Sequence, residues 1–148
     1  MLEFNVNINH APFAARFEAQ LPSSGVTVIF GESGVGKSSL LRALVGLDQH
    51  PNSRVAFNEQ IWQDTHHWVR PEHRHIAYCA QSPQLFPYLS VEANLRYAAK
   101  RASRRAIADA ADKRIAYFSE QFGITDLLAQ YPDQLSGGQQ QRVVLARA

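Results

Sequence analysis

Apolar and polar residues alternate over the first part of the chain. Leu2, Phe4, Val6 and Ile8 alternate with polar residues, and Phe13, Ala15, Phe17 and Ala19 repeat the pattern after a turn near residues 10–12. A period of two is typical of strands with one face in the core and one in water. The pattern therefore predicts two antiparallel strands at the N-terminus.

Three short apolar runs predict further strands. Residues 26–30 are almost continuously apolar, which is typical of a strand buried on both faces in the centre of an α/β sheet. Arg54–Phe57 and residues 75–79 predict two more strands. Cys79 lies in the last run, and we expect it to be an inert core residue.

Helical spacing predicts three helices before the C-terminal part of the chain. Residues 37–46 place Leu40, Leu41 and Leu44 on one side, and Ser90 can cap a helix that continues to Ala98. Residues 103–122 carry a stripe of apolar side chains at helical spacing, and Gly123 is expected to end that helix. We therefore predict a strand-rich front portion followed by a helical insert.

The composition limits the classes of protein to which the chain can belong. The chain has 148 residues, 45% of them hydrophobic, and a formal net charge of +2, which is too small to indicate nucleic-acid binding. Its single cysteine excludes an internal disulfide framework. No apolar run approaches the roughly 18 residues of a membrane-spanning helix, so any membrane role is expected through a partner.

Residues 31–39, GESGVGKSS, match the phosphate-loop pattern G-x-x-x-x-G-K-[ST]. The motif lies between the predicted buried strand and the first predicted helix, which is the context that this loop requires. Glycines let the backbone present successive N–H groups to phosphate oxygens, and the helix adds its positive end. We expect these residues to bind a nucleoside triphosphate: Gly31, Glu32, Ser33, Gly34, Val35, Gly36, Lys37, Ser38 and Ser39. Lys37 would contact the β- and γ-phosphates, and the Ser38 hydroxyl would coordinate Mg²⁺.

A second glycine motif identifies a family. Leu135-Ser136-Gly137-Gly138-Gln139, followed by Gln-Gln-Arg, resembles the signature of ATP-binding-cassette (ABC) proteins. The resemblance implies ATP and Mg²⁺ as cofactors and a head-to-tail homodimer or paired cassette. In such a dimer, Ser136, Gly137, Gly138 and Gln139 of one subunit face the phosphate loop of the other.

The segment between the two motifs, AYCAQSPQLFPYLSV, resembles the Q-loop region of the same family. This implies that Gln81 is a catalytic residue that binds Mg²⁺, and that residues 81–89 contact transmembrane permease subunits. A substrate-binding protein would act indirectly. The aromatic adenine contact of the family falls on Phe13, with His10 as the next candidate, although Phe13 also suits a core position.

The run PEHRHIAYCAQSPQLFPYLSVEANLRYA looks like that of importer ATPases, and most like their molybdate-importing branch. The resemblance implies an ATPase that energises import of molybdate or another oxyanion, located peripherally on the cytoplasmic face of the cell membrane. It also implies an α/β fold: a phosphate-loop (RecA-like) sheet core, an antiparallel β portion and a helical subdomain. On this basis residues 1–81 would form the core, 82–134 the helical subdomain, and 135–148 the signature and its helix.

The family places two catalytic carboxylates on an apolar Asp-Glu strand after the signature helix, and no such strand occurs up to Ala148. We therefore expect this 148-residue polypeptide to lack ATP turnover and to be unstable, because the missing strand would lie beside the strand of residues 26–30.

Other interpretations remain. An ABC ATPase of the nucleic-acid or translation class, or a non-hydrolysing nucleotide-binding module, also fits the two motifs, although we expect no nucleic-acid partner. His66, His67, His73 and His75 are close in sequence, but a solvated loop is favoured over a metal site there. The basic residues between Arg101 and Arg114 favour a solvated helix face.

Overall fold

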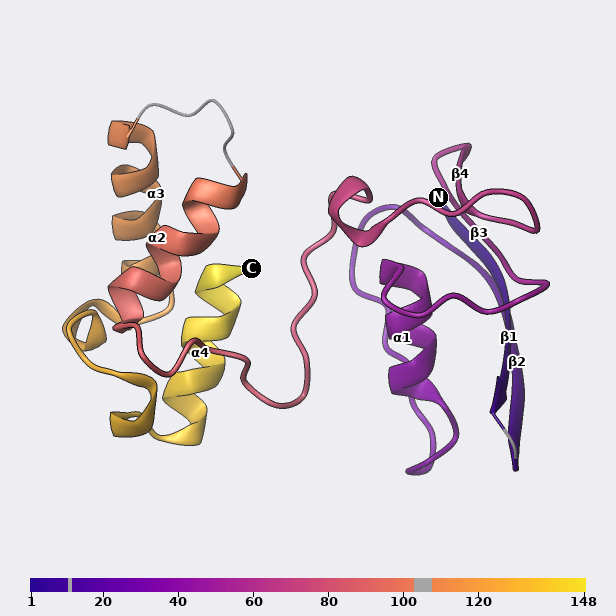
Figure 1. Cartoon of the computed structure of the whole chain (residues 1–148), viewed down its shortest axis with the longest axis horizontal. Helices are drawn as coiled ribbons and strands as arrows, with labels where there is room; N and C mark the ends of the chain where they lie inside the picture. The colour runs from indigo at the N-terminus through magenta and orange to yellow at the C-terminus, as the bar shows by residue number, and fades with distance from the viewer. Residues whose placement is uncertain (11, 103–107) are drawn as a thin grey trace. The chain divides into compact units, whose positions relative to one another are not determined.

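The computed structural model describes residues 1–10, 12–102 and 108–148 and divides the chain into two compact units, Met1–Ile76 and Ala77–Ala148 (Figure 1). Each unit has its own hydrophobic core. The first unit is built on a sheet and one helix, and the second is helical. The finer division that we expected at residues 81 and 134 stays a prediction.

The N-terminal unit contains one antiparallel sheet. Its strands are β1 (Leu2–His10), β2 (Phe13–Leu21), β3 (Arg54–Phe57) and β4 (Gln60–Gln63), in the spatial order β2-β1-β3-β4. Val6 lies opposite Phe17, and Phe4 lies between Ala19 and Val55. The predicted strands at the N-terminus and at Arg54–Phe57 are confirmed, while β4 was not predicted.

Helix α1 (Lys37–Val45) packs against β1 (Figure 1). Alternate β1 residues, Phe4, Val6 and Ile8, share a buried cluster with Leu40, Ala43 and Leu44 of the helix. The period of two in the strand and the helical spacing in α1 thus meet in one core. The predicted helix over residues 37–46 is confirmed, with Gly46 in the left-handed conformation at its C-terminus (φ 82°).

The predicted buried strand at residues 26–30 is wrong in this structure. The segment forms no strand, and Val26, Val28 and Phe30 are 93%, 78% and 97% exposed. A strand exists through hydrogen bonds to a neighbouring strand. Within the described ranges the sheet is entirely antiparallel, and no backbone hydrogen bond joins residues 26–30 to another segment.

The predicted strand at residues 75–79 is also wrong. A short 3₁₀ turn, η1 (Pro71–His73), precedes this segment, and the segment itself has neither helix nor strand. Cys79 is exposed instead of buried in a core. Here too the apolar run lacks a neighbouring strand within the described residues, so its β-propensity has no ladder to join.

The C-terminal unit contains the helices α2 (Val91–Ala102), α3 (Ala108–Gln121) and α4 (Gly137–Arg147), with 3₁₀ turns η2 (Thr125–Leu127) and η3 (Pro132–Gln134). Val91, Leu95, Ile124, Leu135 and Val143 form its core. The Ser90 hydroxyl accepts a hydrogen bond from the Ala93 amide at 3.2 Å, which confirms the predicted cap. Helix α2 runs past the expected end at Ala98, and the expected start of the next helix at Ser103 lies outside the described residues.

Candidate functional site

The glycine-rich loop of residues 31–39 enters helix α1 directly. Gly36 is the N-cap in the left-handed conformation (φ 94°), and Gly34 has φ 86°. The first intrahelical bond joins the Leu40 amide to the Gly36 carbonyl at 2.8 Å. The amides of Lys37, Ser38 and Ser39 therefore have no hydrogen-bond acceptor among the described residues, and no side chain caps them.

Lys37 closes the loop on itself. Its ammonium donates to the carbonyls of Gly31 at 2.8 Å and of Glu32 at 2.6 Å. The cation is thus held over the same loop that presents the three unpaired amides. Unpaired helix N-terminal amides next to an ammonium form a site for an anion such as a phosphate group.

Two aromatic rings of β2 lie close to Gly36 of the loop. A Cβ at Gly36 would be 3.0 Å from Phe13 Cζ and 3.3 Å from Phe17 Cε2, so the close approach and the positive φ both require glycine. Phe13 is half-buried against the core. The structure therefore brings Phe13 to the loop, while its role as an adenine contact stays a prediction. The side chain of His10 lies outside what the structure describes.

The signature residues begin helix α4 in the C-terminal unit. Ser136 is the N-cap: its hydroxyl accepts from the Gln139 amide at 3.3 Å, and the Gln139 side chain accepts from the Ser136 amide at 2.7 Å. This reciprocal capping box fixes the start of the helix. Gly137 and Gly138 are exposed with open space beside them, and their amides have no acceptor among the described residues.

Gln81 is exposed in a segment without helix or strand. The loop that follows it is organised by Asn94, a residue that the sequence reasoning missed. The side chain of Asn94 is fully buried, accepts from the Phe86 amide at 2.9 Å and donates to the carbonyls of Phe86, Leu89 and Ser90. An asparagine inside a helix, where it is intrinsically unfavourable, was the available signal. Tyr88, at the loop surface, is 73% exposed.

The histidine-rich segment forms a turn around Asp64. The Asp64 carboxylate accepts from the amides of His66 and His67 at 2.8 and 2.7 Å. These two hydrogen bonds are the main reason that the pKa of Asp64 lies below its usual value. Among residues 1–10, 12–102 and 108–148, no group of three or more metal-ligating side chains gathers.

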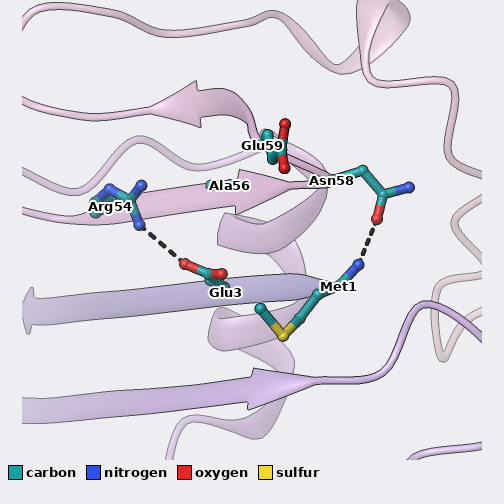
Figure 2. Close-up of a pocket in the computed structure, with 6 residues that line it drawn as sticks. All are labelled: Met1, Glu3, Arg54, Ala56, Asn58 and Glu59. Atoms are coloured by element: carbon teal, nitrogen blue, oxygen red, sulfur yellow. Dashed lines mark hydrogen bonds and ion pairs between the residues drawn. The ribbon is translucent and has the colours of Figure 1, made fainter.

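A surface cavity of about 690 Å³ lies over β1 and β3. Figure 2 shows the residues that line it. It is lined by Met1, Glu3, Arg54, Ala56, Asn58 and Glu59, and Arg54 and Glu3 form an ion pair at 3.5 Å across it. No residue of the glycine-rich loop lines this cavity. None of the described helices is long and apolar enough to cross a membrane.

A glycine-rich loop that leads into an amphipathic helix with unpaired N-terminal amides, and whose carbonyls hold a lysine, defines a protein of the phosphate-loop nucleotide-binding class. The match to known proteins is more specific. Residues 15–148 match the family model described as ABC transporter, and the chain belongs to that family. Membership of this family implies nucleotide binding.

Two relatives with similar sequences share a name. The chain is 44% identical over 136 residues to the molybdenum import ATP-binding protein ModC of Rhodopseudomonas palustris. The aligned region covers 92% of this chain and 36% of that protein. It is 41% identical over 142 residues to the protein of the same name from Methylococcus capsulatus, covering 96% and 38%. The chain thus spans 36% and 38% of the length of these two relatives.

Solved structures confirm the fold class. A dimeric bacterial ABC transporter cassette matches with a TM-score of 0.82 at 23% identity, covering 99% of this chain and 68% of that one. The protein cbiO1 of Clostridium perfringens, part of an ABC transporter complex, matches with a TM-score of 0.76 at 25% identity, covering 99% and 59%. The predicted ABC cassette fold is therefore confirmed.

Proposed function

We propose that this chain supplies the ATP-binding part of the ATP-hydrolysing subunit of an ABC importer, with molybdate or a related oxyanion as the cargo. The observation that carries the proposal is the loop of residues 31–39, which presents three unpaired amides and holds the Lys37 ammonium on two of its carbonyls. Molybdate is proposed as the cargo because the relatives are named molybdenum import ATP-binding proteins.

In this proposal the loop residues hold the triphosphate. The amides of Lys37, Ser38 and Ser39 bind phosphate oxygens, and Lys37 exchanges its two loop carbonyls for the β- and γ-phosphates. The exposed Ser38 hydroxyl supplies a hard oxygen ligand, which suits Mg²⁺. The role of Gln81 as a second ligand of Mg²⁺ stays a prediction. Bound Mg²⁺ would neutralise charge on the phosphate oxygens. Phe13, against Gly36, is proposed as the adenine contact.

The signature helix is proposed to act on a second subunit. Gly137 and Gly138 are exposed with unpaired amides, so the N-terminus of α4 can bind another anion. In a head-to-tail dimer, residues 136–139 of one subunit would contact the triphosphate held by the other subunit. Residues 81–89, with the exposed Tyr88, would contact the permease at the cytoplasmic face of the membrane.

Nucleotide binding is tested with the 148-residue chain and a fluorescent ATP analogue plus Mg²⁺. We expect saturable binding that Lys37→Ala weakens by at least about tenfold, since a charge-assisted contact to phosphate is lost. Lys100→Ala, which removes an exposed lysine of α2, is the matched control and should leave the dissociation constant unchanged. Equal binding by the wild-type chain and Lys37→Ala would contradict the assignment of the loop.

Transport is tested with a hybrid. Residues 1–148 replace the matching part of the Rhodopseudomonas palustris relative, and molybdate uptake is measured in cells that lack that protein. We expect uptake with the hybrid and none with its Lys37→Ala form. A hybrid that hydrolyses ATP but supports uptake of no oxyanion would contradict the importer assignment.

A further inference from the structure

Arg74 lies at the opposite end of α1 from the glycine-rich loop. Its side chain is buried, with the residue only 3% exposed. The guanidinium donates to the carbonyls of Leu44 at 2.7 Å and Ala43 at 3.1 Å, in the last turn of α1. It also donates to the carbonyls of Val69 at 2.9 Å and Trp62 at 3.3 Å, and its Cζ lies 5.6 Å from the Trp62 ring centroid. Arg74 thus joins the end of α1 to β4 and to the segment after it.

The positive charge of Arg74 is balanced by the end of a helix and not by a carboxylate. No carboxylate of the described residues forms an ion pair with it, although arginine stays protonated in proteins. Burial lowers the pKa of the guanidinium from its usual value. The negative C-terminal end of α1 takes the place of a carboxylate, because among the described residues the Leu44 carbonyl has no backbone donor and the Ala43 carbonyl has only the Gly46 amide at 3.0 Å.

Gly46 provides room for this contact. It has φ 82°, and a Cβ there would lie 2.6 Å from Nε of Arg74. Both the backbone conformation and the space beside it therefore exclude a side chain at the C-terminus of α1. The helix ends where the guanidinium can reach its carbonyls.

We propose that Arg74 is a positioning residue for nucleotide binding: it fixes α1 along and around its axis, so that the amides at the other end of the helix stay aligned for the phosphates. This inference rests on the proposed function. Leu40, Ala43 and Leu44 hold α1 by apolar packing, which has little directional preference. The hydrogen bonds of Arg74 are directional, and a nine-residue helix transmits a displacement from one end to the other as a short rigid element.

The test compares Arg74→Met and Arg74→Lys with Arg70→Met in the 148-residue chain. Arg70 is an exposed arginine a few residues away and serves as the matched control. Two quantities are measured: the dissociation constant of the fluorescent ATP analogue, and amide hydrogen exchange along α1 and β1 without nucleotide. Methylguanidinium is then added to Arg74→Met as a chemical replacement for the lost group.

We expect Arg74→Met to raise the dissociation constant about tenfold, because the Leu44 carbonyl at the end of α1 loses its donor, the Ala43 carbonyl loses one of two, and the helix shifts. Arg74→Lys should also bind more weakly, since one ammonium cannot replace the planar fork. Arg70→Met should stay within about twofold of the wild type. Exchange should rise in α1 more than in β1, which a general loss of stability would not produce. Methylguanidinium should restore part of the affinity.

A folded Arg74→Met chain with wild-type affinity would overturn the proposal. If Arg74→Met does not fold, wild-type affinity in a folded Arg74→Lys chain would overturn the proposal instead. If the wild-type chain binds no nucleotide, the proposed function fails. Hydrogen exchange alone then tests the role of Arg74, and equal protection of α1 in Arg74→Lys and wild type overturns that role.

Discussion

Replacement of Asn94 by alanine removes the four side-chain hydrogen bonds that hold the loop of residues 86–89 to α2. Two of the four backbone groups keep another partner, since the Phe86 carbonyl still accepts from the Leu89 amide and the Ser90 carbonyl from the amide of residue 94. The Phe86 amide and the Leu89 carbonyl lose their partner. At about 1–3 kcal/mol for each unsatisfied group, and with water able to reach this half-buried loop, Asn94→Ala should cost about 2–4 kcal/mol.

Asn94→Asp gives a sharper test because it depends on pH. A carboxylate can accept from the Phe86 amide. It also faces the three carbonyl oxygens to which the Asn94 side-chain amide donates in the wild type. Burial and these carbonyls should raise the pKa of the new carboxyl group above its unfolded value of about 3.9. The variant should therefore be most stable below about pH 4 and lose stability as the pH rises through the folded pKa.

The assay is urea unfolding followed by circular dichroism at 222 nm, to which the three helices of the C-terminal unit contribute. Trp62 and Trp68, the two tryptophans of the chain, lie in the N-terminal unit, so their fluorescence monitors that unit separately. Lys100→Ala is the control and should change stability by less than about 0.5 kcal/mol. The reasoning is refuted if Asn94→Ala matches the control, or if Asn94→Asp shows the same stability at pH 4 and pH 7.

Three further changes test other parts of the fold. Ser136→Ala should lower the stability of the C-terminal unit by about 1 kcal/mol in the same urea assay, because helix α4 loses its N-cap; no change would show that the capping box is not formed in solution. Gly36→Ala should cost about 1–3 kcal/mol by tryptophan-monitored unfolding and weaken nucleotide binding, because φ is 94° and the new Cβ would meet Phe13; a neutral result would place the rings elsewhere. Val28→Lys should reduce light scattering by the 148-residue chain without loss of helical signal, because the side chain is 78% exposed and uncharged there; loss of folding would show that this segment is packed in solution.

The strands and helices that the sequence predicted correctly are those whose signal is local. β1, β2 and α1 follow from the period of their apolar residues, and the helix predicted with the signature is α4, whose start the structure shows to be fixed by the local capping pair Ser136 and Gln139. The glycine-rich loop belongs to the same group, because its positive φ angles depend on the residue type itself. These features were sufficient to predict the class and the family of the protein.

The tertiary structure decided what depends on partners distant in sequence. Residues 26–30 have strong β-propensity, but whether they form a strand depends on a neighbouring strand, which the described residues do not provide. Arg74 reaches carbonyls about thirty positions earlier in the chain, and no local pattern marks that contact. The sequence by itself determined the phosphate loop and the signature helix, because backbone conformation and capping are local. Only the tertiary structure decided how α1 is held and which apolar runs join a sheet, because those contacts form after distant segments have met.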